Sequence, residues 1–256
     1  MHGGDSGIGR KRSGDRPRSL SGARLQRLLD AANVLERDGF GIKVAQLPCG
    51  TILKLFRRKR RVSSAAWRPY AQRFVRNAAH LAGAGIPTVQ VRAFFQCAPA
   101  ARHVVAYRPL AGDVLRERLA RGEPVDWSRL AVFMAHLHRQ GIYFRSLHSG
   151  NIVCLPGGAF GLIDIADLYV CRRPLGTLRR GRNLRPMLRD PLLQALRERQ
   201  AFGGFLDAYR REAGFGSLRS EVFSRLAWRQ WRRAGVQSSS SAIGGWSGSG
   251  TVSGRR

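Results

Sequence analysis

In the first sixty residues, the spacing of hydrophobic residues is first typical of a helix and then typical of β-strands. Apolar residues spaced three and four apart predict a helix over residues 25–35, and a turn signal follows at 38–41. Two short runs of extended character, 43–47 and 51–56, are separated by Pro-Cys-Gly. This arrangement predicts a β-hairpin.

A longer amphipathic helix is predicted next, after a capping serine at Ser63 or Ser64. Pro87 prevents it from continuing. Residues 89–96 and 103–107 then have the pattern of two more strands. The apolar face of this helix carries Trp67, Tyr70, Phe74, Ala78 and Leu81.

The second half of the chain has mainly helical character. Apolar residues predict a helix at 127–140, which Gly141 ends. Two short apolar runs, 152–155 and 160–163, surround a Pro-Gly-Gly turn and predict one embedded hairpin. Weaker helical patterns extend from 191 to about 233.

This order of elements does not show the alternation that builds a doubly wound sheet. It predicts an α+β protein with a sheet-rich N-terminal lobe over residues 22–106 and a helical C-terminal lobe over 107–235. Residues 1–21 and the Ser/Gly-rich residues 236–256 have too little apolar surface to offset the entropy of ordering, so both are predicted to be flexible tails.

The charge balance narrows the class of partner. The chain has 45 basic and 16 acidic residues, a net charge of +29, which favours anionic partners such as nucleotide phosphates, phosphorylated sugars, anionic lipid or nucleic acid. No apolar run approaches the ~20 residues that span a bilayer. We expect a cytoplasmic protein that makes peripheral contact with the inner membrane, and the pattern indicates no oligomeric state.

Two polar residues flank the embedded hairpin and are candidate metal ligands. Asp164 follows Asn151 by thirteen residues, and each lies at one end of an apolar run. Magnesium prefers oxygen ligands and usually takes one or two of them from protein. Taken alone, a Gly-Asn pair is typical of a turn and Ile-Asp-Ile of a strand end.

Together, and after a helix that ends in Leu-His-x-x-Gly-Ile, these segments resemble the catalytic and metal loops of the protein-kinase-like superfamily. The resemblance is greatest to small-molecule kinases that carry Asp-Leu-His-x-Gly-Asn. It implies ATP and Mg²⁺ as cofactors, with Asn151 and Asp164 as the metal ligands.

Further candidate nucleotide residues lie upstream. Lys54 alternates with apolar residues, so it either faces solvent or is the strand lysine that holds the α/β phosphates in kinases. Only four basic residues are lysines, which favours the functional reading; Lys43 is the weaker candidate. Gly39 and Gly41 suggest a shortened phosphate-covering turn, although the full Gly-x-Gly-x-x-Gly is absent. Tyr107 begins a segment that resembles the hinge where adenine docks.

Two positions depart from the superfamily pattern. Ser146 occupies the place of the Asp that accepts the substrate's hydroxyl proton, and Phe144 the place of the preceding His. Asn77 occupies the place of the Glu that pairs with the strand lysine. A general base typically contributes ~10²–10⁴-fold to rate, so its loss would slow transfer unless another group substitutes.

Two residues are candidates for that substitution. His148 is one, because histidine is the side chain suited to proton transfer near neutral pH; the alternative is that it orients the loop. Asp167 carries a carboxylate, and the alternatives are an N-cap or a salt bridge to the arginines that follow. We therefore take Ser146 and His148 as the candidate catalytic positions, with Asp167 beside them.

The basic stretch at 172–189 resembles the segment after the metal loop in lipopolysaccharide core heptose and Kdo kinases. Residues 38–188 resemble the small bacterial toluene tolerance proteins more closely, over about 150 residues. In that group Ser also occupies the Asp position. The matching segments are Leu-Lys-Leu-Phe-Arg-Arg-Lys-Arg at 53–60, Pro-Tyr-Ala-Gln-Arg-Phe at 69–74, Tyr-Phe-Arg-Ser-Leu-His at 143–148 and Leu-Ile-Asp-Ile-Ala-Asp-Leu at 162–168.

Three functions follow as hypotheses. The first is an ATP-dependent kinase for an anionic cell-envelope sugar or lipid acceptor. The second is a pseudokinase that regulates envelope biogenesis or solvent tolerance. The third, nucleic-acid binding, rests on charge alone and is the weakest, because the chain shows no recognised nucleic-acid motif.

Overall fold

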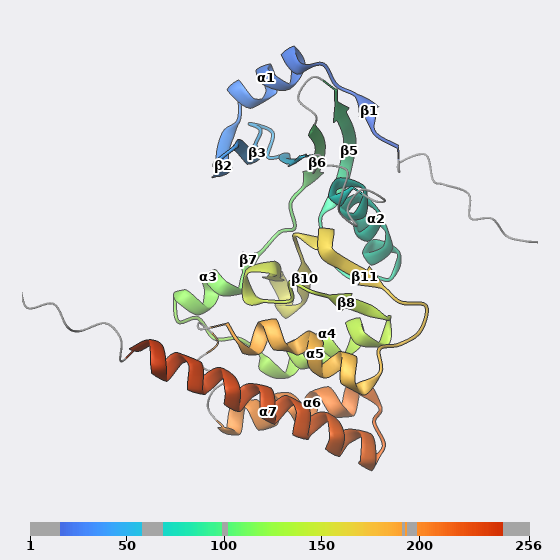
Figure 1. Cartoon of the computed structure of the whole chain (residues 1–256), viewed down its shortest axis with the longest axis vertical. Coiled ribbons are helices and arrows are strands. Elements are labelled where there is room, and N and C mark those ends of the chain that lie inside the picture. Colours follow the sequence, from blue (N-terminus) through green and yellow to red (C-terminus); the bar gives the residue numbers. More distant parts are fainter. Residues whose placement is uncertain (1–15, 58–68, 99–101, 191–192, 194–198, 243–256) are drawn as a thin grey trace, which may run out of the picture.

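The computed structural model describes residues 16–57, 69–98, 102–190, 193 and 199–242. It is a mixed α+β structure in which a sheet-rich part is followed by a helical part (Figure 1). One connection after the last strand of the large sheet leads from the first part to the second (Figure 1). The α+β class predicted from the element order is confirmed.

A six-stranded sheet forms the first part, in the order β1-β5-β6-β4-β3-β2. Its strand pairs are antiparallel except for the short parallel pair β1–β5. The predicted hairpin is β3–β4. The strands are β1 (Arg18–Ser19), β2 (Asn33–Asp38), β3 (Gly41–Gln46), β4 (Ile52–Arg57), β5 (Gln90–Cys97) and β6 (Arg102–Arg108).

Two helices cover opposite faces of this sheet. The helix α1 (Gly22–Asp30) buries Leu25 and Leu29 in a small core with Leu53 and Leu55 of β4. The helix α2 (Tyr70–Gly83) belongs to the main core, which includes Val105 of β6. Because side chains alternate along a strand, residue 54 of β4 lies on the α2 side.

The helix predicted over residues 25–35 is shorter in the structure, so its second half was predicted wrongly. The helix α1 ends at Asp30, and residues 33–38 form the edge strand β2. Most side chains of β2 are exposed, so the strand lacks a hydrophobic alternation and is held by backbone pairing with β3. The cap at Ser63 or Ser64 lies outside the described residues, and α2 begins after Pro69.

Part of each expected tail is folded in the described residues. Arg18–Ser19 form β1, Leu20 is buried, and Ser21 Oγ accepts a hydrogen bond from the Arg24 amide at the start of α1. At the other end, α7 (Ser217–Ala242) runs into the stretch 236–256.

The second part is built from helices and two small sheets. The strands form the sheets β10-β9-β7 and β11-β8. The helix α4 packs on α6, and α5 packs on α7. The elements are β7 (Asp113–Val114), α3 (Leu115–Ala120), α4 (Trp127–Arg139), β8 (Ile142–Phe144), β9 (Ile152–Cys154), β10 (Phe160–Leu162), β11 (Leu168–Val170), α5 (Thr177–Leu188) and α6 (Arg199–Ala213).

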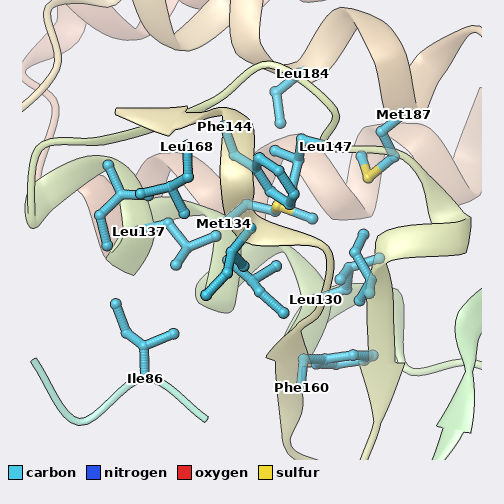
Figure 2. Packing of buried hydrophobic residues seen from close by; sticks show 14 of the residues in the cluster. Ile86, Leu130, Met134, Leu137, Phe144, Leu147, Phe160, Leu168, Leu184 and Met187 are labelled. Atoms are coloured by element: carbon cyan, nitrogen blue, oxygen red, sulfur yellow. The ribbon is translucent and has the colours of Figure 1, made fainter. Parts of the chain in front are cut away.

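The main core packs against the loop that carries Ser146, His148 and Asn151. Leu130, Met134 and Leu137 of α4 are fully buried and pack with Phe144 and Leu147 (Figure 2). This confirms the apolar face predicted for the helix at 127–140. The loop that carries residues 144–151 is thus anchored on one side by apolar packing.

A buried polar cluster joins α4, α5 and α6. His138 Nδ1 lies 2.5 Å from the Tyr209 hydroxyl, and His138 Nε2 lies 3.1 Å from Asn183 Oδ1. Asn183 also accepts from the Phe144 amide and donates to the Phe144 carbonyl. A neutral imidazole that donates through Nε2 and accepts through Nδ1 satisfies all these contacts.

No helix in the described ranges combines the length and the hydropathy that crossing a bilayer requires.

We expect His138 to make stability pH-dependent. Burial, together with the charge of Arg180, lowers the pKa of His138 to about 3, whereas an exposed histidine titrates near 6.5. The unfolded state therefore binds the extra proton first, and the free energy of unfolding should fall as pH drops from 6.5 towards 3. The expected slope is up to about 1.4 kcal/mol per pH unit.

Urea unfolding at several pH values between 7 and 4 measures this slope. His138→Gln should flatten it, whereas His80→Gln, at an exposed position of α2, should leave it unchanged. Equal slopes in the wild type and His138→Gln would contradict the assignment.

Candidate functional site

Lys54 lies inside the molecule rather than facing solvent. It is 8% exposed, on the α2 side of β4, and its Nζ lies 5.9 Å from the ring centroid of Phe56 and 5.8 Å from that of Phe74. A buried ammonium group needs a compensating charge.

That charge is Asp164. Its Oδ1 lies 2.6 Å from Lys54 Nζ, although 110 residues separate the two in sequence. Asp164 has φ 49°, in the left-handed region that residues with a Cβ rarely occupy. Strained backbone of this kind persists where surrounding contacts fix it, and it is concentrated at functional sites.

The hairpin β9–β10 places Asn151 next to the Asp164 segment. Ile152 pairs with Leu162, and the Ile163 amide donates to the Asn151 carbonyl at 3.0 Å. Asn151 Nδ2 donates to the Ser146 carbonyl at 2.9 Å. The other amide atom, Oδ1, is therefore the one that a metal ion would take.

Asn77 does not pair with Lys54, the role that its position suggests. Its Nδ2 donates to the carbonyl oxygens of Ile165 at 2.6 Å and Leu168 at 2.9 Å. This buried amide therefore ties α2 to the segment that follows Asp164. A Glu could not replace it, because a carboxylate donates no hydrogen bond to a carbonyl.

A second contact ties the connection between α2 and β5 to the β9–β10 hairpin. Thr88 Oγ1 donates to the Leu162 carbonyl at 2.8 Å, and the Leu162 amide donates to the Pro87 carbonyl at 3.0 Å. Asp164, two residues further on, is thus fixed relative to both this connection and α2.

Ser146 and Asp167 form a close pair. Ser146 Oγ donates to Asp167 Oδ2 at 2.5 Å. The other carboxylate oxygen, Oδ1, is buried without a hydrogen-bond partner among the described residues. Asp167 therefore supplies a carboxylate beside the position where the sequence has Ser146 in place of Asp.

His148 follows Ser146 by two residues and contacts Asn151. Its Nε2 is 3.2 Å from Asn151 Nδ2, and its Nδ1 is buried without a partner among the described residues. The ring is outside the set of side chains that line the adjoining cavity. This geometry fits a residue that orients Asn151.

A cavity of about 670 Å³ lies between the β2–β3 turn, β4 and the Asp164 segment. The functional candidates Lys54, Ser146, Asp164 and Asp167 all line it. Four cationic side chains face three carboxylates there. The remaining charged lining residues are Asp38, Lys43, Arg57 and Arg102.

The β2–β3 turn contributes one wall. Gly41 has φ 115°, which a glycine adopts readily, and the Phe40 amide donates to Asp38 Oδ1 at 3.0 Å. Arg57 pairs with Asp38 and lies 4.0 Å from the Phe40 ring centroid. Gly39 and Gly41 are therefore at the tip of a hairpin that borders the cavity.

Tyr107 lies near the end of β6, before the connection to the second part. Its ring is 5.4 Å from that of Phe74, and burial raises its pKa, with a further contribution from the charge of Asp164. The side chain is thus part of the packing behind the site. Adenine binding by the backbone at this position stays a prediction.

Asp190 was not identified from the sequence, although it supports the loop at residues 144–151. It is buried and accepts hydrogen bonds from the Ser149 amide and hydroxyl and from Arg116. Asn183 supports Phe144 in the same way. Asn183 lies within the basic stretch and Asp190 directly follows it, and no spacing signal connects either residue to the loop.

A scan of family models finds no match for this chain, and a search of curated proteins finds none either. The resemblance to toluene tolerance proteins therefore stays a prediction.

Among solved structures, the chain is similar to the bifunctional kinase-methyltransferase WbdD, at 17% identity, a TM-score of 0.41 and coverage of 69% of this chain and 45% of the other. A co-crystal structure of WbdD with a kinase inhibitor matches at 17% identity and a TM-score of 0.42, with coverage of 75% and 47%. The chain spans less than half the length of these structures.

Substitutions of the two members of the Lys54–Asp164 pair should change stability by unequal amounts. Lys54→Met replaces a buried charge with an apolar group among aromatic rings and should change the free energy of unfolding by less than about 1 kcal/mol. Asp164→Asn preserves a residue type that tolerates the left-handed region but leaves the ammonium group without its carboxylate. We expect it to cost about 1–3 kcal/mol.

Urea unfolding of the two variants measures this difference, with Asp30→Asn on the exposed surface of α1 as the control. If Lys54→Met were the more destabilising variant, the pair would be chiefly structural.

Proposed function

We propose that this chain is a kinase-like phosphotransferase that uses ATP and Mg²⁺, with a sheet-rich and a helical lobe on either side of its site. The observation that carries the proposal is the contact between Lys54 and Asp164 at a cavity that Ser146 and Asp167 also line. A lysine and a carboxylate in contact, beside a further amide oxygen, are the groups that phosphoryl transfer requires.

The donor set fits a magnesium ion. Asp164 offers a carboxylate whose side chain is 47% exposed. Asn151 offers an amide oxygen at the other end of the β9–β10 hairpin, where its carbonyl accepts a hydrogen bond from the amide of Ile163, the residue before Asp164. Magnesium takes one or two ligands of this kind from protein and the rest from phosphate and water. When bound, the ion would neutralise charge on the β and γ phosphates.

The nucleotide's phosphates fit the cationic wall of the cavity. Lys54 would hold the α and β phosphates, and Lys43, Arg57 and Arg102 add positive charge near the β2–β3 turn. Gly39 and Gly41 at that turn would bring backbone close to the phosphates.

Asp167 is the group best placed to accept the acceptor's proton. In the proposed step, the acceptor oxygen bonds to the γ phosphorus, the bond to the bridging oxygen breaks, and ADP leaves. The hydroxyl proton passes to Asp167, directly or through Ser146, which already donates to its Oδ2. His148 then acts by positioning Asn151.

For the acceptor we propose an anionic cell-envelope sugar or lipid, such as a lipopolysaccharide core sugar. The support is the net charge of +29 and the resemblance of residues 172–189 to the lipopolysaccharide core kinases. Membership of the toluene tolerance group, a cytoplasmic location and peripheral contact with the inner membrane belong to the same proposal.

A pseudokinase is the second candidate function. It is favoured by the neutral side chains of Ser146 and Asn77 at two positions where kinases carry carboxylates, and by Asn77 being engaged with backbone carbonyls. Such a protein would bind nucleotide and regulate an envelope enzyme.

Transfer should depend on Asp164. We expect the purified chain with Mg²⁺ to transfer the γ-phosphate of labelled ATP to lipopolysaccharide core oligosaccharide, and Asp164→Ala to lower the rate at least 100-fold by removing the metal ligand. Asp30→Asn should keep the wild-type rate. ATP binding without any transfer would favour the pseudokinase, and a rate that survives Asp164→Ala would point to a contaminating enzyme.

The base can be assigned by comparing three variants. Asp167→Asn should lower kcat by ~10²–10⁴-fold while calorimetry shows unchanged Mg·ATP affinity, because only the proton acceptor is lost. Ser146→Ala should have a smaller effect on kcat. If His148→Ala removed the activity while Asp167→Asn retained it, the base would be His148 instead.

A further inference from the structure

Two arginines from distant parts of the chain meet at one tyrosine beside the Ser146–Asp167 pair. Arg145 directly precedes Ser146, and Tyr169 on β11 follows Asp167 by two residues. The guanidinium carbon of Arg73, on α2, lies 4.8 Å from the centroid of the Tyr169 ring. Arg145 hydrogen-bonds to the Tyr169 phenol oxygen.

Tyr70 links this cluster to the cavity. Its ring centroid is 5.3 Å from the Arg73 guanidinium carbon, and Tyr70 itself lines the cavity with Ser146 and Asp167. Both rings present a partly open surface, 37% of Tyr70 and 42% of Tyr169 being exposed.

Among the described residues, no ion pair neutralises the positive charge of the cluster. Within the described ranges, neither Arg73 nor Arg145 forms an ion pair, although Asp167 acts on Arg145 through space. Arg73 Nη2 is buried and has no hydrogen-bond partner among the described residues. A buried charged donor in that state calls for an explanation, and an anionic ligand provides one.

The phenol of Tyr169 reports the same excess of positive charge. Hydrogen bonds from Arg145 and Arg73 lower the pKa of Tyr169 below its ordinary value. An anion that bound to these arginines would compete for the same donors.

We propose that Arg73, Arg145, Tyr70 and Tyr169 form the acceptor subsite, and that it binds the phosphate or carboxylate of an anionic saccharide. The guanidinium groups match such anions in geometry, and the exposed faces of the tyrosines offer stacking surfaces for sugar C–H groups. This subsite rests on the proposed phosphotransferase function, because it places the acceptor on the Asp167 side of the cavity.

The position of the cluster separates it from the nucleotide. Lys54 and Asp164 are the proposed nucleotide and metal residues of the cavity. Arg145 and Tyr169 instead flank Ser146 and Asp167 in sequence. An acceptor held there by its charged group would direct a neighbouring hydroxyl towards the Asp167 carboxylate.

Binding of small probes to the full chain, without nucleotide, tests the subsite. We expect glucose 6-phosphate or glucuronate to bind in ligand-observed NMR titrations, and neutral glucose to bind at least tenfold more weakly. Arg73→Gln and Arg145→Gln should each weaken binding of the charged sugars at least tenfold. Arg219→Gln, at an exposed position of α7, is the matched control and should bind like the wild type.

Spectroscopic titration of the tyrosines measures the pKa of Tyr169. A purely structural role of the arginines would not make this pKa respond to a bound charged sugar. Arg145→Gln should raise the pKa of Tyr169, and saturating glucose 6-phosphate should raise it in the wild type but not in Tyr169→Phe, which lacks the signal. Thermal unfolding identifies any variant that fails to fold, and Arg73→Lys then replaces Arg73→Gln.

Charged sugars that bound equally to the wild type and both arginine variants, or to none of them, would overturn the subsite. Vesicles of phosphatidylcholine and phosphatidylglycerol supply the membrane comparison: sedimentation that depended on Arg73 and Arg145, without sugar binding, would assign the cluster to lipid and also overturn it. Calorimetry with Mg·ATP separates the two proposals. A chain that bound charged sugars through these arginines but bound no nucleotide would contradict the phosphotransferase function and leave the sugar-binding subsite standing.

Discussion

The two hydrogen bonds of the Asn77 amide are the constraint on which the rest of the site depends. They connect α2 to the carbonyls of Ile165 and Leu168, on either side of Asp167 and directly after Asp164. They hold the segment that contains Asp164 and Asp167 against α2, and the same segment contacts Lys54 and Ser146. A neutral amide thereby performs a structural task in a place where the resemblance to kinases suggests a charged one.

Much of this arrangement follows from local pattern. The β3–β4 hairpin, the amphipathic α4 and the β9–β10 hairpin all come from period and turn chemistry, and the hairpin alone implies that Asn151 lies near Asp164. The strand β2 could not be predicted in the same way, because its exposed side chains carry no alternation and its stability comes from backbone pairing.

The side-chain partners were harder to predict than the elements. The bonds from Asn77 span 88 and 91 residues, that from Ser146 to Asp167 spans 21, and that from Ser149 to Asp190 spans 41. Such pairs depend on how helices dock on the loops, for which one sequence offers no spacing rule. The contact of Lys54 with Asp164 was not predicted, because the resemblance assigned the two residues separately to phosphates and to the metal ion; both of these functions stay predictions.

The internal ion pair at the centre of the site has a thermodynamic consequence. Lys54 occupies a carboxylate oxygen of Asp164 that a metal ion would also use, so under the proposed function each side chain would release the other when nucleotide and metal bound. Phosphates that draw Lys54 away free Asp164, and a cation that takes Asp164 frees Lys54. By linkage, the proposed function then implies that the two ligands would bind with positive cooperativity, each more tightly in the other's presence than alone.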